Sequence, residues 1–308
     1  MSHSHGHLHR FDENERSGDA RLLGAVVVNI LLTVVQVIGG VISGSLSLLA
    51  DALHNSSDAG ALVIAWVARR IGRKPADGRQ TFGYRRAELV GALINATILN
   101  VLGLYLVYAA VLRALAPAPV EGWTVVVVAA MALVVDVATA LLTYQMAGRS
   151  LNVKAAFVHN IADAFSSAAV IVAGVLIVAY QWFVVDVIVT FAIAGYVLYH
   201  GVSITREASR ILTLGVPVGI HVSMLADALR ALDGVADVHH LHVWALDESQ
   251  RSFEGHVVID QRDTRLAEQV KRRMREVLRR EGIAHATIEC EYGAVSSECR
   301  EGEVVRQH

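Results

Sequence analysis

The sequence has 308 residues, of which 54% are hydrophobic and 18% are charged, and its formal net charge is −2. Its mean hydropathy of +0.46 is too high for an ordinary soluble domain, so the composition predicts a membrane protein. The nearly balanced charge gives no indication of a nucleic-acid partner, and none is expected.

The first 20 residues are polar and contain acids, which is typical of neither a secretory signal nor a transit peptide. We expect segment 1–20 to be a His-rich tail. Its histidines alternate with small or apolar residues and are suited to capturing zinc without a fixed geometry; they are His3, His5, His7 and His9. The alternative is a tail whose histidines have no such role.

Six uncharged or nearly uncharged stretches follow this tail. Each is long enough to cross a hydrocarbon core of about 30 Å as a helix, which takes about 20 residues. The stretches are 22–42, 46–68, 89–112, 123–147, 155–179 and 183–204. The sequence therefore predicts an α-helical polytopic membrane domain with six transmembrane helices over residues 21–211.

Basic residues gather in the loops on one face of this domain. The connection between the second and third stretches carries Arg69, Arg70, Arg73, Lys74, Arg79, Arg85 and Arg86, and the loop after the fourth carries Arg149 and Lys154. The loops of the opposite face have only Arg113, at an edge. Because loops rich in Lys and Arg stay in the cytoplasm, both termini are predicted to be cytoplasmic.

After Arg206 the hydrophobic runs shorten and charged residues become frequent. We therefore expect a soluble cytoplasmic domain over 212–292 and a C-terminal tail over 293–308. The periodicity predicts a helix, two strands, a basic amphipathic helix and a third strand, at 222–232, 235–246, 253–259, 264–281 and 284–292. The order αββαβ is typical of a two-layer α+β domain with helices on one face of the sheet.

Two of the predicted membrane helices carry pairs of ionisable residues, which are costly in a bilayer and therefore candidates for function. The second helix contains His54 and Asp58, and the fifth contains His159 and Asp163. The i,i+4 spacing places each pair on one face of its helix. Counted from the helix ends, the pairs lie at the same depth within about one turn. This pattern predicts a four-ligand cage.

Two imidazoles and two carboxylates suit a borderline divalent cation, and a tetrahedral set of two nitrogens and two oxygens fits Zn²⁺. Mg²⁺ and Ca²⁺ prefer more oxygen ligands. The alternative is that each pair is a hydrogen bond between helices. Asp51, Asp136 and Asp186 are weaker candidates: Asp136 is central and suited to relaying protons or bonding a neighbouring helix, and Asp186 lies near the outer interface, where water would hydrate it. We expect a structural role for the last two, and we keep Asp51 and Asp136 as auxiliary residues of the site.

Four motifs occur in order along the chain: GSLSLLADALHNSSD, PADGRQTFGYRRAE, NVKAAFVHNIADAFSS and VHHLHVWAL…GHVVID…ATIECE. With these motifs the sequence resembles the cation diffusion facilitator family of metal/proton antiporters over nearly its whole length. The resemblance implies a homodimer of six-helix protomers with a cytoplasmic ferredoxin-like domain. It also implies that His54, Asp58, His159 and Asp163 bind the transported ion. Because zinc carriers of the family usually have His in the first of these positions, His54 favours Zn²⁺ over Cd²⁺ or Mn²⁺.

The sequence departs from the family pattern in two places. One is the loop after the predicted second helix, and the other is the start of the predicted cytoplasmic domain. Some bacterial members have a metal site in that loop, with histidines near an FGH motif. Here Asp77 remains but Gln80 and Tyr84 occupy the loop and no histidine does, so we expect this site to be absent. Leu214 replaces an acid found in many relatives, so an ion pair from Arg86 to this region is not expected.

The resemblance also implies a metal site in the predicted cytoplasmic domain, residues 212–292, which we call the tail domain. Its ligands would be His239, His242, His256 and Glu291. On an ideal strand His239 and His242 lie on opposite faces, so this set needs a bulge or His239 at the strand's start. His240 is the substitute if His239 points away, and Cys290, a reduced thiol in the cytosol, is a further auxiliary. The alternative is that these are ordinary polar strand residues.

Taken together, these features predict proton-coupled efflux of Zn²⁺ from the cytosol across a bacterial inner membrane by alternating access. Metal binding requires deprotonated ligands, which links it to proton release, and histidine titrates near neutrality. Zn²⁺ is expected as the substrate and as a structural or regulatory ion of the tail domain. The alternatives are another metal (Co²⁺, Ni²⁺, Cd²⁺ or Fe²⁺), a membrane-anchored metal sensor, or an intramembrane zinc hydrolase. The hydrolase is disfavoured because the sequence has no HExxH and the cage has no open coordination position.

Overall fold

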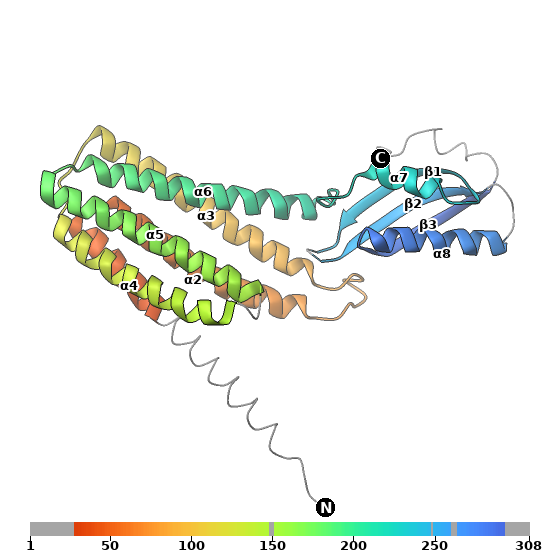
Figure 1. Cartoon of the computed structure of the whole chain (residues 1–308), viewed down its shortest axis with the longest axis horizontal. Helices are drawn as coiled ribbons and strands as arrows, with labels where there is room; N and C mark the ends of the chain where they lie inside the picture. Colours follow the sequence, from red (N-terminus) through yellow and green to blue (C-terminus); the bar gives the residue numbers. More distant parts are fainter. Residues whose placement is uncertain (1–27, 148–150, 248, 260–263, 293–308) are drawn as a thin grey trace, which may run out of the picture. The chain divides into compact units, whose positions relative to one another are not determined.

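The computed structural model describes residues 28–147, 151–247, 249–259 and 264–292 (Figure 1). The predicted tails, with His3, His5, His7 and His9, lie outside the described residues. The chain divides into two compact units. One combines the chain up to Ile64 with Ile94–Ser203, and the other combines Ala65–Leu93 with the chain from Ile204 onward.

Each predicted membrane stretch coincides with a helix, which confirms the predicted fold class. A first helix, Val28–Ser43, precedes the others, which are α2 (Leu46–Gly72), α3 (Arg86–Leu115), α4 (Gly122–Ala147), α5 (Leu151–Tyr180) and α6 (Val184–Leu212). Four of the described helical segments are long and apolar enough to cross a membrane: Arg86–Leu115, Gly122–Leu141, Phe157–Tyr180 and Val184–Leu212. Helix α2 has 27 residues, but the run HNSSD in its middle lowers its hydropathy.

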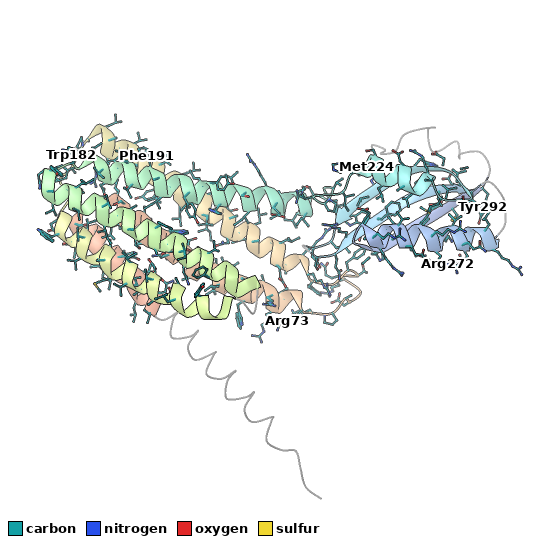
Figure 2. The ribbon with its side chains drawn as sticks, in the orientation of Figure 1. Arg73, Trp182, Phe191, Met224, Arg272 and Tyr292 are labelled. Atoms are coloured by element: carbon teal, nitrogen blue, oxygen red, sulfur yellow. The ribbon has the colours of Figure 1, made fainter. Side chains whose placement is uncertain are left out.

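Close contacts at glycines bring the helices of the first unit together. Helix α3 lies beside α6, and α4 lies beside α5 (Figure 1). A Cβ at Gly103 would lie 2.7 Å from Leu198 of α6, and one at Gly174 would lie 2.8 Å from Val126 of α4. Small residues therefore allow these backbones to approach, as is usual between membrane helices. Large apolar side chains such as Trp182 and Phe191 are exposed on the outside, where a bilayer would cover them (Figure 2).

Asp186 of α6 binds the N-terminus of α2. Its fully buried carboxylate accepts hydrogen bonds from the backbone N–H groups of Leu46 (2.8 Å) and Ser47 (3.2 Å). The hydroxyls of Ser45 and Ser47 donate to the same carboxylate, each at 2.6 Å. The first N–H groups of a helix have no partner within it, and an anion there is favourable. Asp186 is therefore buried and bonded rather than exposed at the interface, and its role is structural.

The tail domain in the second unit has the predicted order αββαβ. Its elements are α7 (Val222–Arg230), β1 (Val235–Ala245), β2 (Arg251–Ile259), α8 (Thr264–Arg280) and β3 (Ile283–Tyr292), all within two residues of the predicted bounds. The sheet order is β1-β2-β3, with β1 antiparallel and β3 parallel to β2. Both helices bury apolar side chains against the sheet, around the fully buried Phe253, whereas Arg272 lies on the exposed face of α8 (Figure 2).

Residues at the start of α3 contact the tail domain within the second unit. The Arg86 guanidinium donates through Nε to the backbone carbonyl of Leu246 at 3.3 Å, and Arg85 lies 3.5 Å from the carboxylate of Asp247. Arg86 thus bonds to the end of β1, and no ion pair links it to the segment around Leu214 among the described residues.

Candidate metal sites

The four predicted ligands of the membrane site face one another across α2 and α5. His54 Nε2 lies 3.5 Å from Asp163 Oδ1, and His159 Nε2 lies 3.3 Å from Asp58 Oδ2. Within the helices, His54 Nδ1 lies 3.7 Å from Asp58 Oδ2, and His159 Nε2 lies 3.4 Å from Asp163 Oδ2. Each histidine therefore contacts the acid of its own helix and the acid of the other helix. We call these four side chains the cage.

The two contacts across α2 and α5, at 3.5 and 3.3 Å, are as long as the edges of a zinc site. A Zn–ligand distance of about 2.0–2.2 Å gives a tetrahedral site edges of about 3.3–3.6 Å between ligand atoms. The nitrogen–oxygen contacts of the cage measure 3.3, 3.4, 3.5 and 3.7 Å. Ligand atoms of His54, Asp58 and Asp163 all lie within 4.8 Å of one another, and His159 contacts both acids. Three of the four side chains are therefore close enough to share one cation, and His159 lies beside both of the acids among them.

Buried polar atoms of the cage have no hydrogen bonds. They are both ring nitrogens of His54, Oδ2 of Asp58 and Oδ1 of Asp163. Side-chain exposure is 9% for His54 and 10% for Asp163, against 27% for Asp58 and 42% for His159. Because buried polar groups are nearly always bonded, several unbonded ones at one point indicate a ligand. The simpler interpretation, a hydrogen bond within each pair, does not account for them.

Asp51 and Asp136 lie outside the cage. Asp51 accepts hydrogen bonds from Gln36 and Ser166, and Asp136 accepts one from Ser167. The sequence reasoning missed the two serines, although they follow Asp163 by three and four residues and therefore share its side of α5. That spacing was the available signal.

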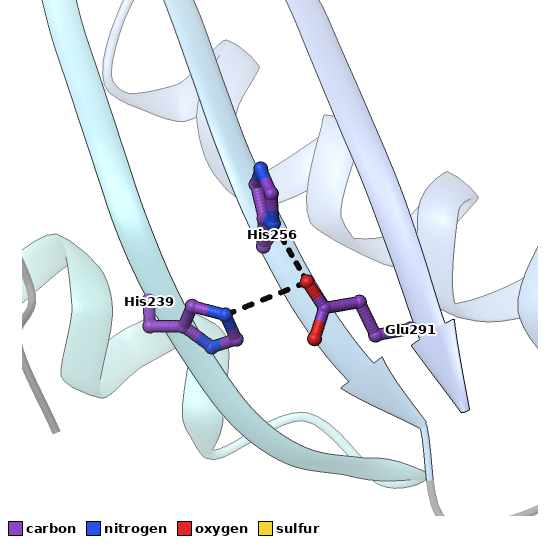
Figure 3. Close-up of side chains that lie close together, drawn as sticks. All are labelled: His239, His256 and Glu291. Atoms are coloured by element: carbon purple, nitrogen blue, oxygen red, sulfur yellow. Dashed lines mark hydrogen bonds and ion pairs between the residues drawn. The ribbon is translucent and has the colours of Figure 1, made fainter. Parts of the chain in front are cut away.

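The tail domain holds a second group of side chains that could hold a metal ion, one from each strand (Figure 3). His256 Nδ1 lies 2.7 Å from Glu291 Oε1, and His239 Nε2 lies 3.6 Å from the same oxygen. Only 2% of the His239 side chain is exposed, and neither of its ring nitrogens makes a hydrogen bond. A buried imidazole with no hydrogen bond beside a carboxylate and a second imidazole fits a zinc site.

A β-bulge separates His239 from His242. Pairing with β2 shifts between these residues, and His240 has a φ of 52°, so His239 pairs with His256 whereas His242 pairs with Glu254. The structure does not bring His242 into the group of His239, His256 and Glu291. His240 is closer, since its ring stacks on that of His256 with 4.8 Å between centroids.

Cys290, the other auxiliary candidate, is a free, half-buried cysteine next to Glu291. Burial raises the pKa of its thiol. Because the thiolate is the form that binds metal, this environment disfavours Cys290 as a ligand at neutral pH.

Asp77 organises the loop between α2 and α3 without any histidine. Its carboxylate accepts hydrogen bonds from the backbone N–H groups of Gln80 (2.9 Å) and Arg79 (2.8 Å), and from the hydroxyl of Tyr84 (2.8 Å). These bonds to the charged form lower the pKa of Asp77, with the backbone bond from Gln80 contributing most. Asp77 therefore holds the loop by hydrogen bonds of its own.

Residues 22–213 match the sequence model of a family described as the cation efflux transmembrane domain, and residues 217–292 match cation efflux protein, cytoplasmic domain. Zinc transporter ZitB of Escherichia coli (strain K12) is 32% identical over 298 residues, which cover 95% of this chain and 93% of the relative. The cadmium, cobalt and zinc/H(+)-K(+) antiporter of Bacillus subtilis (strain 168) is 31% identical over 93% of this chain and 92% of its own. Metal cation efflux system protein CzcD of Cupriavidus metallidurans is 33% identical over 84% of this chain and 79% of its own length.

Proposed function

Because the chain belongs to the cation efflux family, whose members are membrane transporters and not enzymes, we propose that it exports Zn²⁺ from the cytosol in exchange for protons. The observation that carries this proposal is the crosswise contact of His54, Asp58, His159 and Asp163 at distances that suit a tetrahedral zinc site. Relatives named as a zinc transporter and as a metal/H(+)-K(+) antiporter support it.

The cage couples metal and proton movement through its own ligands. A histidine offers a lone pair to a metal only when that nitrogen carries no proton, so binding Zn²⁺ from the cytosol releases protons from the cage. When the cage opens to the other side, protons from that side return to the ligands and displace the ion. Alternating access at a site buried between helices thus yields antiport without a separate proton pathway.

Two imidazole nitrogens and two carboxylate oxygens favour Zn²⁺ over cations that need six or more oxygens. Transport of Cd²⁺ or Co²⁺ is the second candidate, because the Bacillus subtilis relative is named for cadmium, cobalt and zinc. The cage has protein ligands at all four positions of a tetrahedron, which disfavours zinc hydrolysis, a reaction that needs an open position.

We also propose that the tail domain binds Zn²⁺ as a regulatory or structural ion through His239, His256 and Glu291 (Figure 3). The support is the buried imidazole of His239, whose ring nitrogens lack hydrogen bonds. Three protein donors leave a fourth position, for which His240, stacked on His256, is better placed than His242. Metal there would join all three strands.

The arrangement of the chain in the cell is part of the proposal. It comprises a His-rich tail (1–20), a transmembrane domain (21–211), a cytoplasmic ferredoxin-like domain (212–292) and a C-terminal tail (293–308). The placement of Arg and Lys supports cytoplasmic termini in a bacterial inner membrane. Residues 217–292 match a family of cytoplasmic domains whose name refers to a dimer, which supports a homodimer.

Purified protein in proteoliposomes tests the function directly. An imposed pH gradient should drive Zn²⁺ across the membrane while protons move the opposite way, and Asp163→Ala should abolish both fluxes. The matched control is Asp233→Ala, which removes a carboxylate of the tail domain that is 98% exposed. A metal sensor would bind Zn²⁺ without moving it, and an Asp163→Ala variant with full activity would show that the cage is not the transport site.

A further inference from the structure

A network of buried polar side chains lies one helical turn from the cage and contains none of its ligands. Asp51 precedes His54 by three residues on α2, and Ser166 follows Asp163 by three residues on α5. Both pairs share a helix face. Because α2 and α5 run in opposite directions, the two displacements lead to the same side of the cage.

The carboxylate of Asp51 joins three helices. Its Oδ1 accepts a hydrogen bond from the Ser166 hydroxyl of α5 at 2.6 Å, and its Oδ2 accepts one from Nε2 of Gln36, on the first helix, also at 2.6 Å. Gln36 in turn accepts a hydrogen bond from Asn55 of α2 at 3.1 Å. Asp51, Gln36 and Asn55 are 1%, 0% and 2% exposed, so water does not compete for the bonds among these three, whereas Ser166 is half-buried.

Ser167 extends the network to a fourth helix. Its hydroxyl lies 2.8 Å from Asp136 Oδ2 on α4 and 3.5 Å from Asp51 Oδ2. Ser167 is fully buried and Asp136 is 6% exposed. Helices α2, α4, α5 and the first helix are therefore joined at one level next to the cage.

This network restrains the separation of α2 and α5. Loss of the bond from Ser166 would leave an oxygen of the buried Asp51 carboxylate without its donor, so the Asp51–Ser166 link resists separation of the two helices. One turn away, the same two helices hold the 3.5 Å contact of His54 with Asp163 and the 3.3 Å contact of His159 with Asp58. Over one turn a helix is rigid, so the link and the width of the cage are coupled.

We propose that Asp51 is a positioning residue that sets the width of the cage, through Ser166, and thereby its preference for Zn²⁺ over the larger Cd²⁺. A larger cation needs longer metal–ligand bonds, so it fits only if α2 and α5 move apart. Metal selectivity in proteins depends on geometry and ligand type rather than on raw affinity. The inference rests on the proposed function of the cage, to which it adds the residue that controls selectivity.

The test is Ser166→Ala, which removes the shorter of the two hydroxyl contacts that join α5 to Asp51, 2.6 Å against 3.5 Å for Ser167, and leaves every cage ligand in place. Rates of Zn²⁺ and Cd²⁺ transport are measured in proteoliposomes over a range of metal concentrations. The variant should raise the KM for Zn²⁺ and shift the Cd²⁺/Zn²⁺ ratio of kcat/KM about tenfold toward Cd²⁺, as expected for one buried hydrogen bond. Ser166→Thr, which keeps a hydroxyl, should retain the wild-type ratio. Ser56→Ala, an exposed serine of α2, is the matched control.

Each other outcome has a definite meaning. An unchanged metal ratio in Ser166→Ala, or an equal loss of kcat for both metals, overturns the inference. A change in protons exchanged per Zn²⁺ with unchanged KM also overturns it and makes Asp51 a proton-carrying residue. Failure of the proposed function is distinguishable, because wild-type protein would then transport no metal or Asp163→Ala would transport it fully. Thermal unfolding of each variant in detergent confirms that it is folded.

Discussion

Removing the carboxylate of Asp186 should destabilise the membrane domain, because among the described residues only Asp186 accepts from the N–H groups of Leu46 and Ser47. In Asp186→Ala the backbone N–H groups of Leu46 and Ser47 lose their acceptor. The hydroxyls of Ser45 and Ser47 also lose it, but they lie 3.2 Å apart and can bond each other. Only one of the two hydroxyls can donate to the other, so the uncompensated loss comprises at least the two backbone donors.

The size of the effect follows from this count. A buried donor left without a partner costs about 1–3 kcal/mol, so the two N–H groups together cost about 2–6 kcal/mol. Asp186→Asn keeps one acceptor oxygen, so it should lose about half of this, or about 1–3 kcal/mol. Both values exceed the effect of an average surface substitution, which is within about 0.5 kcal/mol.

Unfolding of the purified protein in detergent, followed by circular dichroism, measures the effect. The order of stability should be wild type, then Asp186→Asn, then Asp186→Ala. Asp227→Ala, at a carboxylate of α7 that is 76% exposed, provides the control and should unfold like the wild type. If Asp186→Ala is as stable as that control, water or another side chain satisfies the α2 N-terminus and the buried-cap reasoning is wrong.

Three further predictions concern the rest of the chain. Equilibrium dialysis of the full-length protein should reveal two classes of bound Zn²⁺, of which His54→Ala removes one and His239→Ala the other; loss of both classes in either variant would argue against separate sites. The pKa of Asp77 is lowered on folding, so its contribution to loop order is present above the ordinary carboxylate pKa and is lost as the pH falls toward the folded value. Tyr84→Phe should move the onset of loop proteolysis to higher pH, and an unchanged onset would remove the hydroxyl from the explanation. Phe253 is fully buried in the core of the tail domain, so Phe253→Ala should cost about 3–5 kcal/mol of stability. The loss is measured as a lower melting temperature, and a smaller loss would mean that the core collapses around the gap.

Local patterns in the sequence predict the elements well, because those patterns depend on neighbouring residues. Alternation and amphipathicity give the order αββαβ with bounds accurate to two residues. The i,i+4 spacing places His54 with Asp58 and His159 with Asp163 on single faces, and the structure turns these faces toward each other. That the four residues bind the transported ion stays a prediction.

Contacts between residues far apart in the chain could not be predicted. Asp186 bonds residues about 140 positions earlier, and hydropathy alone suggested an exposed group at the interface. The place of His242 depends on a bulge at His240, whose positive φ leaves no pattern in the residue types. The sequence required a bulge, or His239 at the start of the strand, if His239 and His242 were to share a site, but the bulge that forms takes His242 away from the other ligands.

Helix α2 shows why the least apolar of the membrane helices carries the candidate site. Ser47, Asp51, His54 and Asp58 follow one another at intervals of four, three and four residues, so they form one stripe along the helix. Ser47 bonds Asp186 on α6, Asp51 bonds Ser166 on α5, and the last two belong to the cage. This polar stripe lowers the hydropathy of α2 below that of the helices that are apolar enough to cross a membrane. Such a stripe is tolerable in a membrane only if other helices cover it, because lipid offers no hydrogen bonds. The polar residues proposed to bind the ion and those that hold α2 in place therefore have the same physical requirement, and their position on one face of one helix follows from it.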